Sequence, residues 1–354
     1  MNYSLRDVLD GKLKIEYIDT DLEKKINSNW DRVSKPINGF GEFEKLIARI
    51  GSVQGLEIPD LEHNKLIVCC GDHGIVEEGV SQTGQEVTRL CAENIGKGLT
   101  TAGVMASSLG IDITAVDVGI NYPGQIPGTV YKRIKNGTDN FLKKEAMSLD
   151  ECEKAIQTGM DLASDAALEG CKMILVGEMG IGNTTSAAVM AGYLLDLKAD
   201  DVTGRGAGLD DKGLIRKKEV VEKALSMYRN LSPVEVMSHF GGLELAAMTG
   251  IIIGGGLNHI PIVLDGMLSM ISALVAEKTA PGCRNYLIPS HKSKEPVAVR
   301  LSEVLGLNPV IDGRMALGEG TGAVMMVSLL KMAEVAYTRA LKFGDSGVEQ
   351  YKRF

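Results

Sequence analysis

Short runs of apolar residues recur along the middle of the chain, and each ends in glycine or a small polar cluster. The runs are KLIVCC, IDITAVDVG, KMILVG and IPIVLDG, and helical spacing of apolar positions follows them. Parallel strands buried on both faces give continuous apolar runs, whereas a strand with one solvent face alternates. The pattern therefore predicts an α/β fold with a doubly wound, mostly parallel, Rossmann-like sheet.

Both ends of the chain have the pattern of helices instead. Residues 1–60 are polar, with an amphipathic segment around FEKLIARIGSVQGL, and AVMMVSLLKMAEVAYTRALKF near the other end has helical periodicity. We expect these ends to pack together as a small helical domain of residues 1–60 and 326–354. Residues 61–325 would then form a large α/β catalytic domain.

One stretch, TGIIIGGGLNHIPIVLDGMLSMISALVAE, is apolar enough to suggest a membrane helix. Its three glycines at 254–256, with polar residues and a proline after them, divide it into pieces too short to span a bilayer. We interpret it as the end of a helix, a turn, a buried strand and a following helix, and we expect no membrane association.

Charge and composition argue against a nucleic-acid-binding protein and against a secreted protein with disulfides. The net charge is −8 and aromatic residues make up 5% of the chain, which argues against a basic or base-stacking nucleic-acid surface. The six cysteines form no CxxC pair, and the N-terminus lacks the apolar core of a signal peptide. We therefore expect reduced cysteines and a cytoplasmic protein.

The segment GEMGIGNTTSAA follows the third apolar run and has the form of a ligand-binding turn. Gly180 and Gly182 let backbone N–H groups approach a ligand, and Asn183, Thr184 or Thr185 can cap the helix that follows. A helix N-terminus with free amides suits a phosphate monoester. The alternative is a tight strand-to-helix turn that binds nothing.

Glu178, inside this turn, narrows the choice of ligand. A carboxylate would repel a polyphosphate, and the lysine of a nucleoside-triphosphate loop is missing. A sugar monophosphate fits better, because Glu178 could accept hydrogen bonds from ribose hydroxyls. Glu178 could equally accept hydrogen bonds from the amides of its own loop.

Two further loops offer groups for the phosphate. TGRGAGLDDKGLIRKK contains Arg205, Lys212, Arg216 and Lys217, and PSHKSKEP contains Ser290, His291, Ser293 and Lys294. One basic side chain that reaches the phosphate would suffice. The others are expected on a solvated helix face or a plain surface turn.

The segment DGRMALGEGTGA supplies a candidate general base. Glu319 lies between Gly318 and Gly320, so a substrate could press against its carboxylate, with Met315 and Leu317 as apolar neighbours. The alternative is a glutamate at the start of the last helix, stabilised by the helix dipole.

Asp72 and His73 follow the first apolar run and could suggest a metal. Companion ligands at metal spacing are missing and the chain has only five histidines, so we expect a structural turn and no metal site.

Together these segments resemble the nicotinate-nucleotide–dimethylbenzimidazole phosphoribosyltransferases, the CobT family. The similar stretches are GDHGIVEEGVSQTGQEVT, GEMGIGNTTSAA, GGLELAAMTG with VLDGMLSMISALVA, PSHKSKEP and LGEGTGA, in the family's order over roughly residues 65–325. The resemblance implies phosphoribosyl transfer from nicotinate mononucleotide to 5,6-dimethylbenzimidazole, giving α-ribazole 5′-phosphate and nicotinate, in cobalamin nucleotide-loop assembly. It also implies a homodimer whose active site borrows the partner's small domain, and no cofactor.

By similarity, Glu319 is the general base and Glu178 a second acidic residue near the ribose. The residues expected to bind the nucleotide and its phosphate are Gly177, Gly180, Gly182, Asn183, Thr184, Gly206, Lys217, Asp265 and Ser293. Those expected around the aromatic base are Ser81, Gln85, Met179, Met315 and Leu317. The basic partner of the phosphate stays open between Lys217 and Lys294.

The chemistry of this reaction agrees with the residues present. The pyridine nitrogen of the nucleotide already carries positive charge, so nicotinate leaves as a neutral ring nitrogen and needs neither a general acid nor a metal. The attacking imidazole must lose its N–H proton, for which one carboxylate suffices. Two alternatives remain, a hydrolase of ribonucleotide monophosphates in which Glu319 activates water, and a nucleotide-binding regulator. The natural base also stays open among benzimidazoles, adenine and phenols.

Overall fold

A six-stranded parallel sheet forms the centre of the structure, a computed structural model that describes residues 3–353. The strands are β1 (Asn64–Gly71), β2 (Asp112–Gly119), β3 (Thr129–Tyr131), β4 (Met173–Met179), β5 (Ile262–Val263) and β6 (Leu287–Ile288). Their order is β3-β2-β1-β4-β5-β6, and each neighbouring pair is parallel. This is the Rossmann order, in which the chain changes direction between β1 and β4. The predicted doubly wound α/β fold is confirmed.

Successive residues of each central strand enter different cores, which explains the continuous apolar runs. In β1, Ile67 and Cys69 belong to the core on one face of the sheet, and Leu66 and Val68 to the core on the other. Two edge strands, β3 and β6, were not predicted. The apolar stretches around them, TVY and YLI, are too short to stand out, unlike the stretch IPIVL that contains β5.

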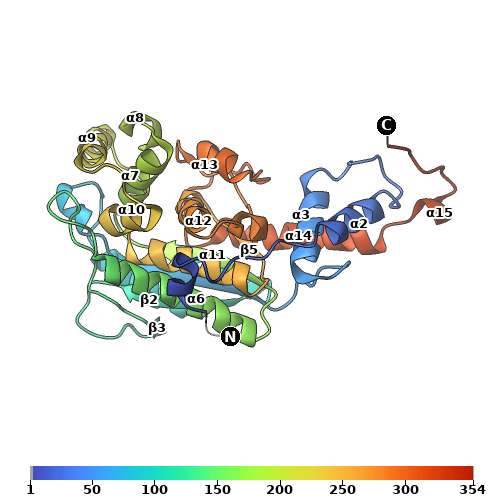
Figure 1. The fold of residues 1–354 in the computed structure, drawn as a ribbon, viewed down its shortest axis with the longest axis horizontal. Helices are drawn as coiled ribbons and strands as arrows, with labels where there is room; N and C mark the ends of the chain where they lie inside the picture. Colours follow the sequence, from blue (N-terminus) through green and yellow to red (C-terminus); the bar gives the residue numbers. More distant parts are fainter. Residues whose placement is uncertain (1–2, 354) are drawn as a thin grey trace.

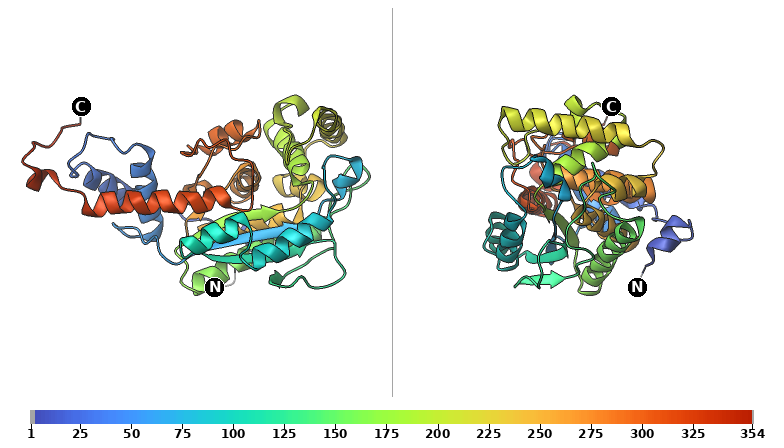
Figure 2. Two further views of the ribbon diagram at one scale, coloured as in Figure 1. Left: turned by 180° about the vertical axis from the view of Figure 1, so that it is seen from behind. Right: turned by 90° about the vertical axis from the view of Figure 1, so that its left-hand side faces the viewer.

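Helices cover both faces (Figures 1 and 2). One core includes residues from α6 (Leu149–Leu168), α7 (Asn183–Leu195), α10 (Pro233–Phe240), α11 (Leu243–Leu257) and α12 (Met267–Thr279). The other includes residues from α2 (Thr20–Trp30), α3 (Glu42–Gln54), α4 (Glu86–Gly96), α5 (Thr101–Ser108) and α14 (Thr321–Arg339). The shorter or more peripheral elements are α1 (Leu5–Leu9), η1 (Gly74–Glu78), α8 (Ala199–Val202), α9 (Asp211–Met227), η2 (Cys283–Tyr286), α13 (Ala298–Leu305) and α15 (Phe343–Ser346).

The apolar stretch from residue 243 onward forms the central helix α11, of which every residue is buried. The expected order of helix end, turn, buried strand and following helix is confirmed, with the turn at residues 258–259, but the three glycines do not break α11, which continues through them to Leu257. Their small size serves packing instead: a Cβ at Gly254 would lie 2.7 Å from the Ala163 side chain, and one at Gly255 would overlap Ile262. The buried strand predicted after the helix is present as β5.

Segments from both ends of the chain lie together at one end of the molecule, where α14 runs beside α2 and α3 (Figure 1). The rings of Trp30 in α2 and Tyr337 in α14 are 4.9 Å apart between centroids. Helix α1 lies elsewhere: the backbone N–H of Leu5 donates to Gln157 of α6. The division into residues 1–60 with 326–354 and residues 61–325 stays a prediction.

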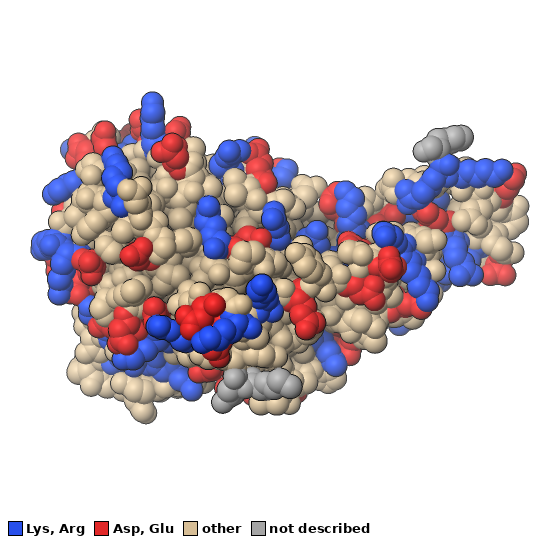
Figure 3. Space-filling model, viewed as in Figure 1, with Lys and Arg blue, Asp and Glu red and all other residues tan. Residues whose placement is uncertain are grey.

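The surface carries charges of both signs in alternation over the face seen in Figure 3. Within residues 3–353, none of the helices combines the length and the apolar character needed to cross a bilayer. All six cysteines have free thiols, and Cys69, Cys70, Cys152 and Cys283 are buried.

We expect Gly250→Ala to destabilise the fold, because α6 and α11 touch through their backbones. A Cβ at Gly250 would overlap the carbonyl oxygen of Ile156, and Gly159 faces it from α6 with its Cα 3.0 Å from that Cβ. Overpacking of this kind costs about 1–3 kcal/mol in the free energy of unfolding, measured by urea denaturation. Gly344→Ala is the control, since a Cβ there has nothing within 4 Å. Equal stability of the two variants would contradict the account.

Candidate active site

A cavity of about 200 Å³ lies at the carboxyl ends of β4, β5 and β6, close to where the strand order reverses. Open α/β sheets bind ligands at such a point, because the loops that follow neighbouring strands diverge there. Eleven of the predicted site residues line it: Gly177, Glu178, Met179, Gly180, Asn183, Thr184, Gly206, Asp265, Ser293, Leu317 and Glu319. The cavity thus joins segments that are far apart in the sequence.

The glycine turn after β4 leads directly into α7. Gly180 packs against Gly71 of β1, where a Cβ would overlap the Gly71 carbonyl oxygen. Gly182 is the N-cap of α7 with φ of +100°, and no side chain caps this helix. The expectation that Asn183, Thr184 or Thr185 caps it is therefore wrong, and the helix end is left without a side-chain acceptor.

Glu178 is a buried carboxylate in the wall of this cavity. It is 8% exposed and accepts a hydrogen bond from the Asn183 side chain, rather than from amides of its own loop. Gly318 faces it, where a Cβ would lie 2.7 Å from Glu178 Oε1. Burial, followed by the negative charges of Glu244 and Asp265, raises the pKa of Glu178 to about 8.

Glu319 reaches the cavity from the segment before α14. It is half-buried, and its Oε2 has no hydrogen-bond partner in the part of the chain that the structure describes. Its φ is +59°, a left-handed conformation that is uncommon for a residue with a side chain. Gly177 allows this approach, because a Cβ there would lie 2.6 Å from the Glu319 carbonyl oxygen.

Asp265, just beyond β5, accepts hydrogen bonds from two backbone N–H groups at the start of α14. Gly322 N lies 2.7 Å from Oδ1, and Gly320 N lies 3.2 Å from Oδ2. Burial raises the pKa of Asp265 to about 7, and these N–H groups oppose the shift. His291 Nδ1 lies 3.6 Å from Asp265 Oδ1.

Lys217 lies behind the cavity wall and is fully buried. Its ammonium donates to Thr184 Oγ1 over 2.8 Å, and burial lowers the pKa of Lys217 to about 8. Lys294, the other candidate, is exposed and does not line the cavity. Gly206 brings its loop close to Thr184, since a Cβ there would lie 2.7 Å from Thr184 Oγ1.

The other basic candidates lie on the surface. Arg205, Lys212 and Arg216 are exposed, and Arg205 forms an ion pair of 2.5 Å with Asp211. Of the basic residues considered for the phosphate, Lys217 is thus the one that is buried next to the cavity.

The residues predicted around the aromatic base divide into two groups. Met179 and Leu317 line the main cavity, and Leu317 is 52% exposed. Ser81 lines a smaller neighbouring cavity of about 60 Å³, together with Gly182 and Thr184. Met315 and Gln85 line neither.

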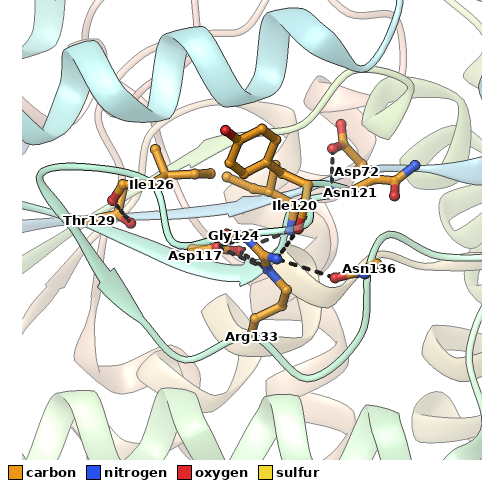
Figure 4. Close-up of polar contacts among 10 residues, drawn as sticks. Asp72, Asp117, Ile120, Asn121, Gly124, Ile126, Thr129, Arg133 and Asn136 are labelled. Atoms are coloured by element: carbon orange, nitrogen blue, oxygen red, sulfur yellow. Dashed lines mark hydrogen bonds and ion pairs between the residues drawn. The ribbon is translucent and has the colours of Figure 1, made fainter.

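Gln85 is held by protein groups on both sides of its amide. Its Nε2 donates to the His73 carbonyl oxygen, and its Oε1 accepts from Asn121 Nδ2, each over 3.0 Å. The Asn121 backbone N–H donates to Asp72 Oδ2 over 2.8 Å. Figure 4 shows Asp72 and Asn121 at this junction.

A buried ion pair that the sequence analysis missed holds the loop around Asn121. Arg133 Nη2 lies 2.6 Å from Asp117 Oδ2, and both side chains are almost fully buried. The guanidinium also donates to the carbonyl oxygens of Tyr122 and Gly124, so it fixes the loop that carries Asn121 (Figure 4). An arginine on a polar segment gave no signal in the sequence that its partner would be Asp117.

Three comparisons with known proteins bear on this site. A model of a family described as phosphoribosyltransferase matches residues 15–348. A relative from Ruminiclostridium cellulolyticum is 35% identical over 340 residues, covering 96% of this chain and 97% of its own length. One from Thermus thermophilus is 38% identical over 337 residues, covering 94% of this chain and all of its own length. Both are named nicotinate-nucleotide–dimethylbenzimidazole phosphoribosyltransferase.

The chain belongs to this phosphoribosyltransferase family.

Solved structures agree with the family assignment. A crystal structure of CobT from Thermus thermophilus matches with a TM-score of 0.88 and 36% identity, covering 94% of this chain and 100% of that one. The resemblance to the CobT family that GEMGIGNTT and LGEGTGA indicated is thereby confirmed.

His73 and Glu244 form a second buried pair that the sequence analysis also missed. His73 Nε2 lies 2.6 Å from Glu244 Oε1, and His73 Nδ1 lies 2.8 Å from Ser186 Oγ, all three residues being fully or nearly fully buried. His73 is thus engaged by protein side chains, as expected for a structural turn. The available signal was Glu244 itself, a lone carboxylate in the apolar stretch GGLELAAMTG. Among residues 3–353, no three His, Cys, Asp or Glu side chains are arranged to hold a metal ion.

We expect Glu178→Gln to stabilise the phosphoribosyltransferase at alkaline pH. The pKa of Glu178 is raised from 4.5 to about 8 on folding, so between these values the folded state binds more protons than the unfolded state and stability falls as pH rises. Glutamine does not ionise and escapes this loss. The melting temperature of the variant should exceed that of the wild type by about 1–2 °C for each kcal/mol recovered at pH 8.5, and by far less at pH 5.

The exposed Glu303→Gln on α13 serves as the control for that comparison. A Glu178→Gln difference of equal size at both pH values would show that the gain does not come from ionisation.

Proposed function

We propose that this chain transfers the 5-phosphoribosyl group of nicotinate mononucleotide to 5,6-dimethylbenzimidazole, or a related lower-ligand base, in cobalamin nucleotide-loop assembly. The names of the relatives support the two substrates. The observation that carries the proposal is Glu319, which lines the cavity and whose buried Oε2 has no hydrogen-bond partner among the described residues. A base needs such a free oxygen to accept a proton.

The phosphate end of the nucleotide is assigned to the side of the cavity next to α7. The start of α7 has no side-chain cap, and its positive dipole end attracts a phosphate. Thr184, Gly206 and Ser293 line this region, and Lys217 lies directly behind Thr184. The Lys217 ammonium has three donors, of which only the one to Thr184 has a partner among the described residues. An anion nearby would accept from the others and favour the charged form of Lys217.

The ribose and the cationic pyridine ring are assigned to the middle of the cavity, beside Glu178. This carboxylate and that of Glu319 flank the space with groups that favour positive charge. Positive charge develops on ribose C1′ as its bond to the pyridine nitrogen lengthens, so these carboxylates stabilise the transition state more than a neutral wall would. Asn183 keeps Glu178 in place.

Glu319 then acts as the general base. The imidazole nitrogen of the incoming base attacks C1′ while the bond from C1′ to the pyridine nitrogen breaks, and its electron pair returns to the pyridine ring. The N–H proton on the opposite imidazole nitrogen passes to Glu319. Attack from the face opposite the leaving ring converts the β-linkage to α, and nicotinate departs as a neutral ring nitrogen. Alignment of the two substrates supplies a further part of the rate.

Met179 and Leu317 are assigned as apolar contacts of the aromatic base, because both line the cavity near Glu319. The base-binding roles of Ser81, Gln85 and Met315 stay predictions. Ser81 faces the neighbouring small cavity, and Gln85 is engaged by Asn121 and the His73 backbone.

We also propose that the enzyme is a homodimer of the cytoplasm. Met325, Met332 and Val335 are exposed along α14, and Val104 is exposed on α5, which contacts α14. Exposed apolar side chains gathered on neighbouring helices favour burial against a second copy. Leu317 at the cavity mouth is exposed too, which leaves room there for a segment of the partner.

We expect Glu319→Gln to lower the rate of transfer by about 10²–10⁴ while the far-ultraviolet circular dichroism stays that of the wild type. The loss follows from removal of the proton acceptor. Glu334→Gln, on the same helix but outside the cavity, should transfer at the wild-type rate. Normal turnover of Glu319→Gln would remove Glu319 from its role.

The same assay without acceptor base separates transfer from hydrolysis. Wild-type enzyme with nicotinate mononucleotide alone should release little nicotinate, and rapid release would favour a hydrolase. Tight binding of the nucleotide without turnover, across a panel of aromatic acceptors, would instead favour a regulatory protein.

We expect Lys217→Gln to raise the KM for nicotinate mononucleotide by about 10–100-fold, the effect of a lost hydrogen bond to a charged group. Lys294→Gln is the matched control and should change this KM little, because Lys294 is exposed outside the cavity. Steady-state kinetics with the nucleotide varied decides between the two lysines. The reverse result would assign the phosphate to Lys294.

A further inference from the structure

The backbone that carries Glu319 runs through three successive left-handed residues. Their φ angles are +86° at Gly318, +59° at Glu319 and +85° at Gly320. The two glycines adopt this conformation readily, but a residue with a Cβ avoids it. Strain of this kind persists only where the surroundings impose it, so other groups must hold Glu319 in this position.

Asp265 supplies part of that hold. Its two oxygens accept from Gly320 N and Gly322 N, at 3.2 Å and 2.7 Å. These N–H groups belong to the first turn of α14, which has no acceptor of its own because its N-cap, Gly320, has no side chain. The carboxylate, only 4% exposed, also lies at the positive end of a helix of 19 residues.

Strand β4 closes the other side of the same segment. A Cβ at Gly177 would lie 2.6 Å from the Glu319 carbonyl oxygen and 2.9 Å from Gly320 N. The segment is therefore enclosed between the backbone of β4 and the carboxylate that follows β5. With the main chain fixed on both sides, the Glu319 side chain is directed to the cavity.

The loop after β6 is joined to the same carboxylate. His291 is 3% exposed, and its Nδ1 lies 3.6 Å from Asp265 Oδ1 and 3.2 Å from Ser290 Oγ. Ser290 Oγ donates to the Asp265 carbonyl oxygen over 3.1 Å. Ser293, two residues beyond His291, lines the cavity. Asp265 therefore contacts the segment of Glu319 on one side and the loop of Ser293 on the other.

We propose that Asp265 is a positioning residue for the general base: it holds the left-handed segment that presents Glu319 and joins it, through Ser290 and His291, to the loop assigned to the phosphate. The proposal rests on the proposed function, in which Glu319 accepts the proton. Both Asp265 oxygens are occupied by N–H groups, so Asp265 acts through Glu319 and not on the substrate. Binding of the phosphate and placement of the base are then set by one buried group.

The first test is Asp265→Asn. The amide keeps the shape and one acceptor oxygen, but it turns an NH₂ group toward one of the two N–H donors. We expect kcat to fall by about 10–100-fold, the usual effect of losing a group that orients a catalytic residue. The KM and Kd for nicotinate mononucleotide should change by less than about threefold, because Glu319 contributes to the transition state and not to ground-state binding.

A matched variant tests whether loss of any helix cap has this effect. Asp19 also accepts from two backbone N–H groups, those of Asp21 and Leu22 at the start of α2, outside the cavity. Asp19→Asn should leave kcat unchanged. If Asp265→Asn fails to fold, Asp265→Ser replaces it, since serine is also a good helix cap and is uncharged.

Chemical rescue separates positioning from proton transfer. Formate should restore part of the activity of Glu319→Ala, because it can replace the missing carboxylate in the cavity, and it should not restore that of Asp265→Asn. Hydrogen exchange of the amides at residues 318–322 reports directly how firmly the backbone of this segment is fixed. This measurement does not depend on the reaction catalysed. We expect faster exchange in Asp265→Asn than in the wild type.

Several results would overturn the proposal. A folded Asp265→Asn variant with wild-type kcat and KM would show that Asp265 does not position the base. A raised KM for the nucleotide with unchanged kcat would make Asp265 a ligand of the nucleotide instead. Unchanged hydrogen exchange of the amides at residues 318–322 in Asp265→Asn would show that Asp265 does not fix the backbone of this segment. Wild-type enzyme that does not transfer phosphoribosyl groups would instead reject the proposed function, and the exchange experiment would still decide the role of Asp265.

Discussion

The close backbone contact between β4 and the start of α14 is the constraint on which the rest of the site depends. Gly177 has no side chain, so the Glu319 carbonyl can approach the strand, and the next residue of β4, Glu178, lines the same cavity. A larger residue at position 177 would push α14 away from the sheet. Glu319, Glu178 and the end of the sheet share one cavity because two stretches of backbone meet there without side chains between them.

The charges around the cavity match a nucleotide with a positive ring and a negative phosphate. Glu178, Asp265 and Glu319 line one part, whereas Lys217 and the uncapped end of α7 lie behind another. Burial raises the pKa of Glu178 to about 8 and that of Asp265 to about 7, so each carboxyl disfavours its ionised form in the folded protein. A cationic ligand would reverse this preference, which makes the site less stable empty than occupied.

The sequence predicted those parts of the structure whose signal is local. Continuous apolar runs predicted β1, β2, β4 and β5. Glycines beside a carboxylate predicted that the segments of Glu178 and Glu319 belong to a site. The roles of the individual residues came from the family resemblance and not from periodicity. Features that depend on distant partners could not be predicted. Glu244 and His73 are 171 positions apart, and the contact of Arg133 with Asp117 depends on a loop conformation. The glycines at 254–256 suggested a break in the apolar stretch, but they lie inside α11, where Gly254 packs against α6 and Gly255 against β5.

Helix α14 has the segment of Glu319 at one end and contacts helices from the N-terminal part of the chain near the other. Its 19 residues extend about 28 Å, and Tyr337 near its far end contacts Trp30 of α2. One continuous helix therefore joins the cavity to the place where the two ends of the chain pack together. A substitution at the contact between Trp30 and Tyr337 acts on the same helix whose first turn follows Glu319.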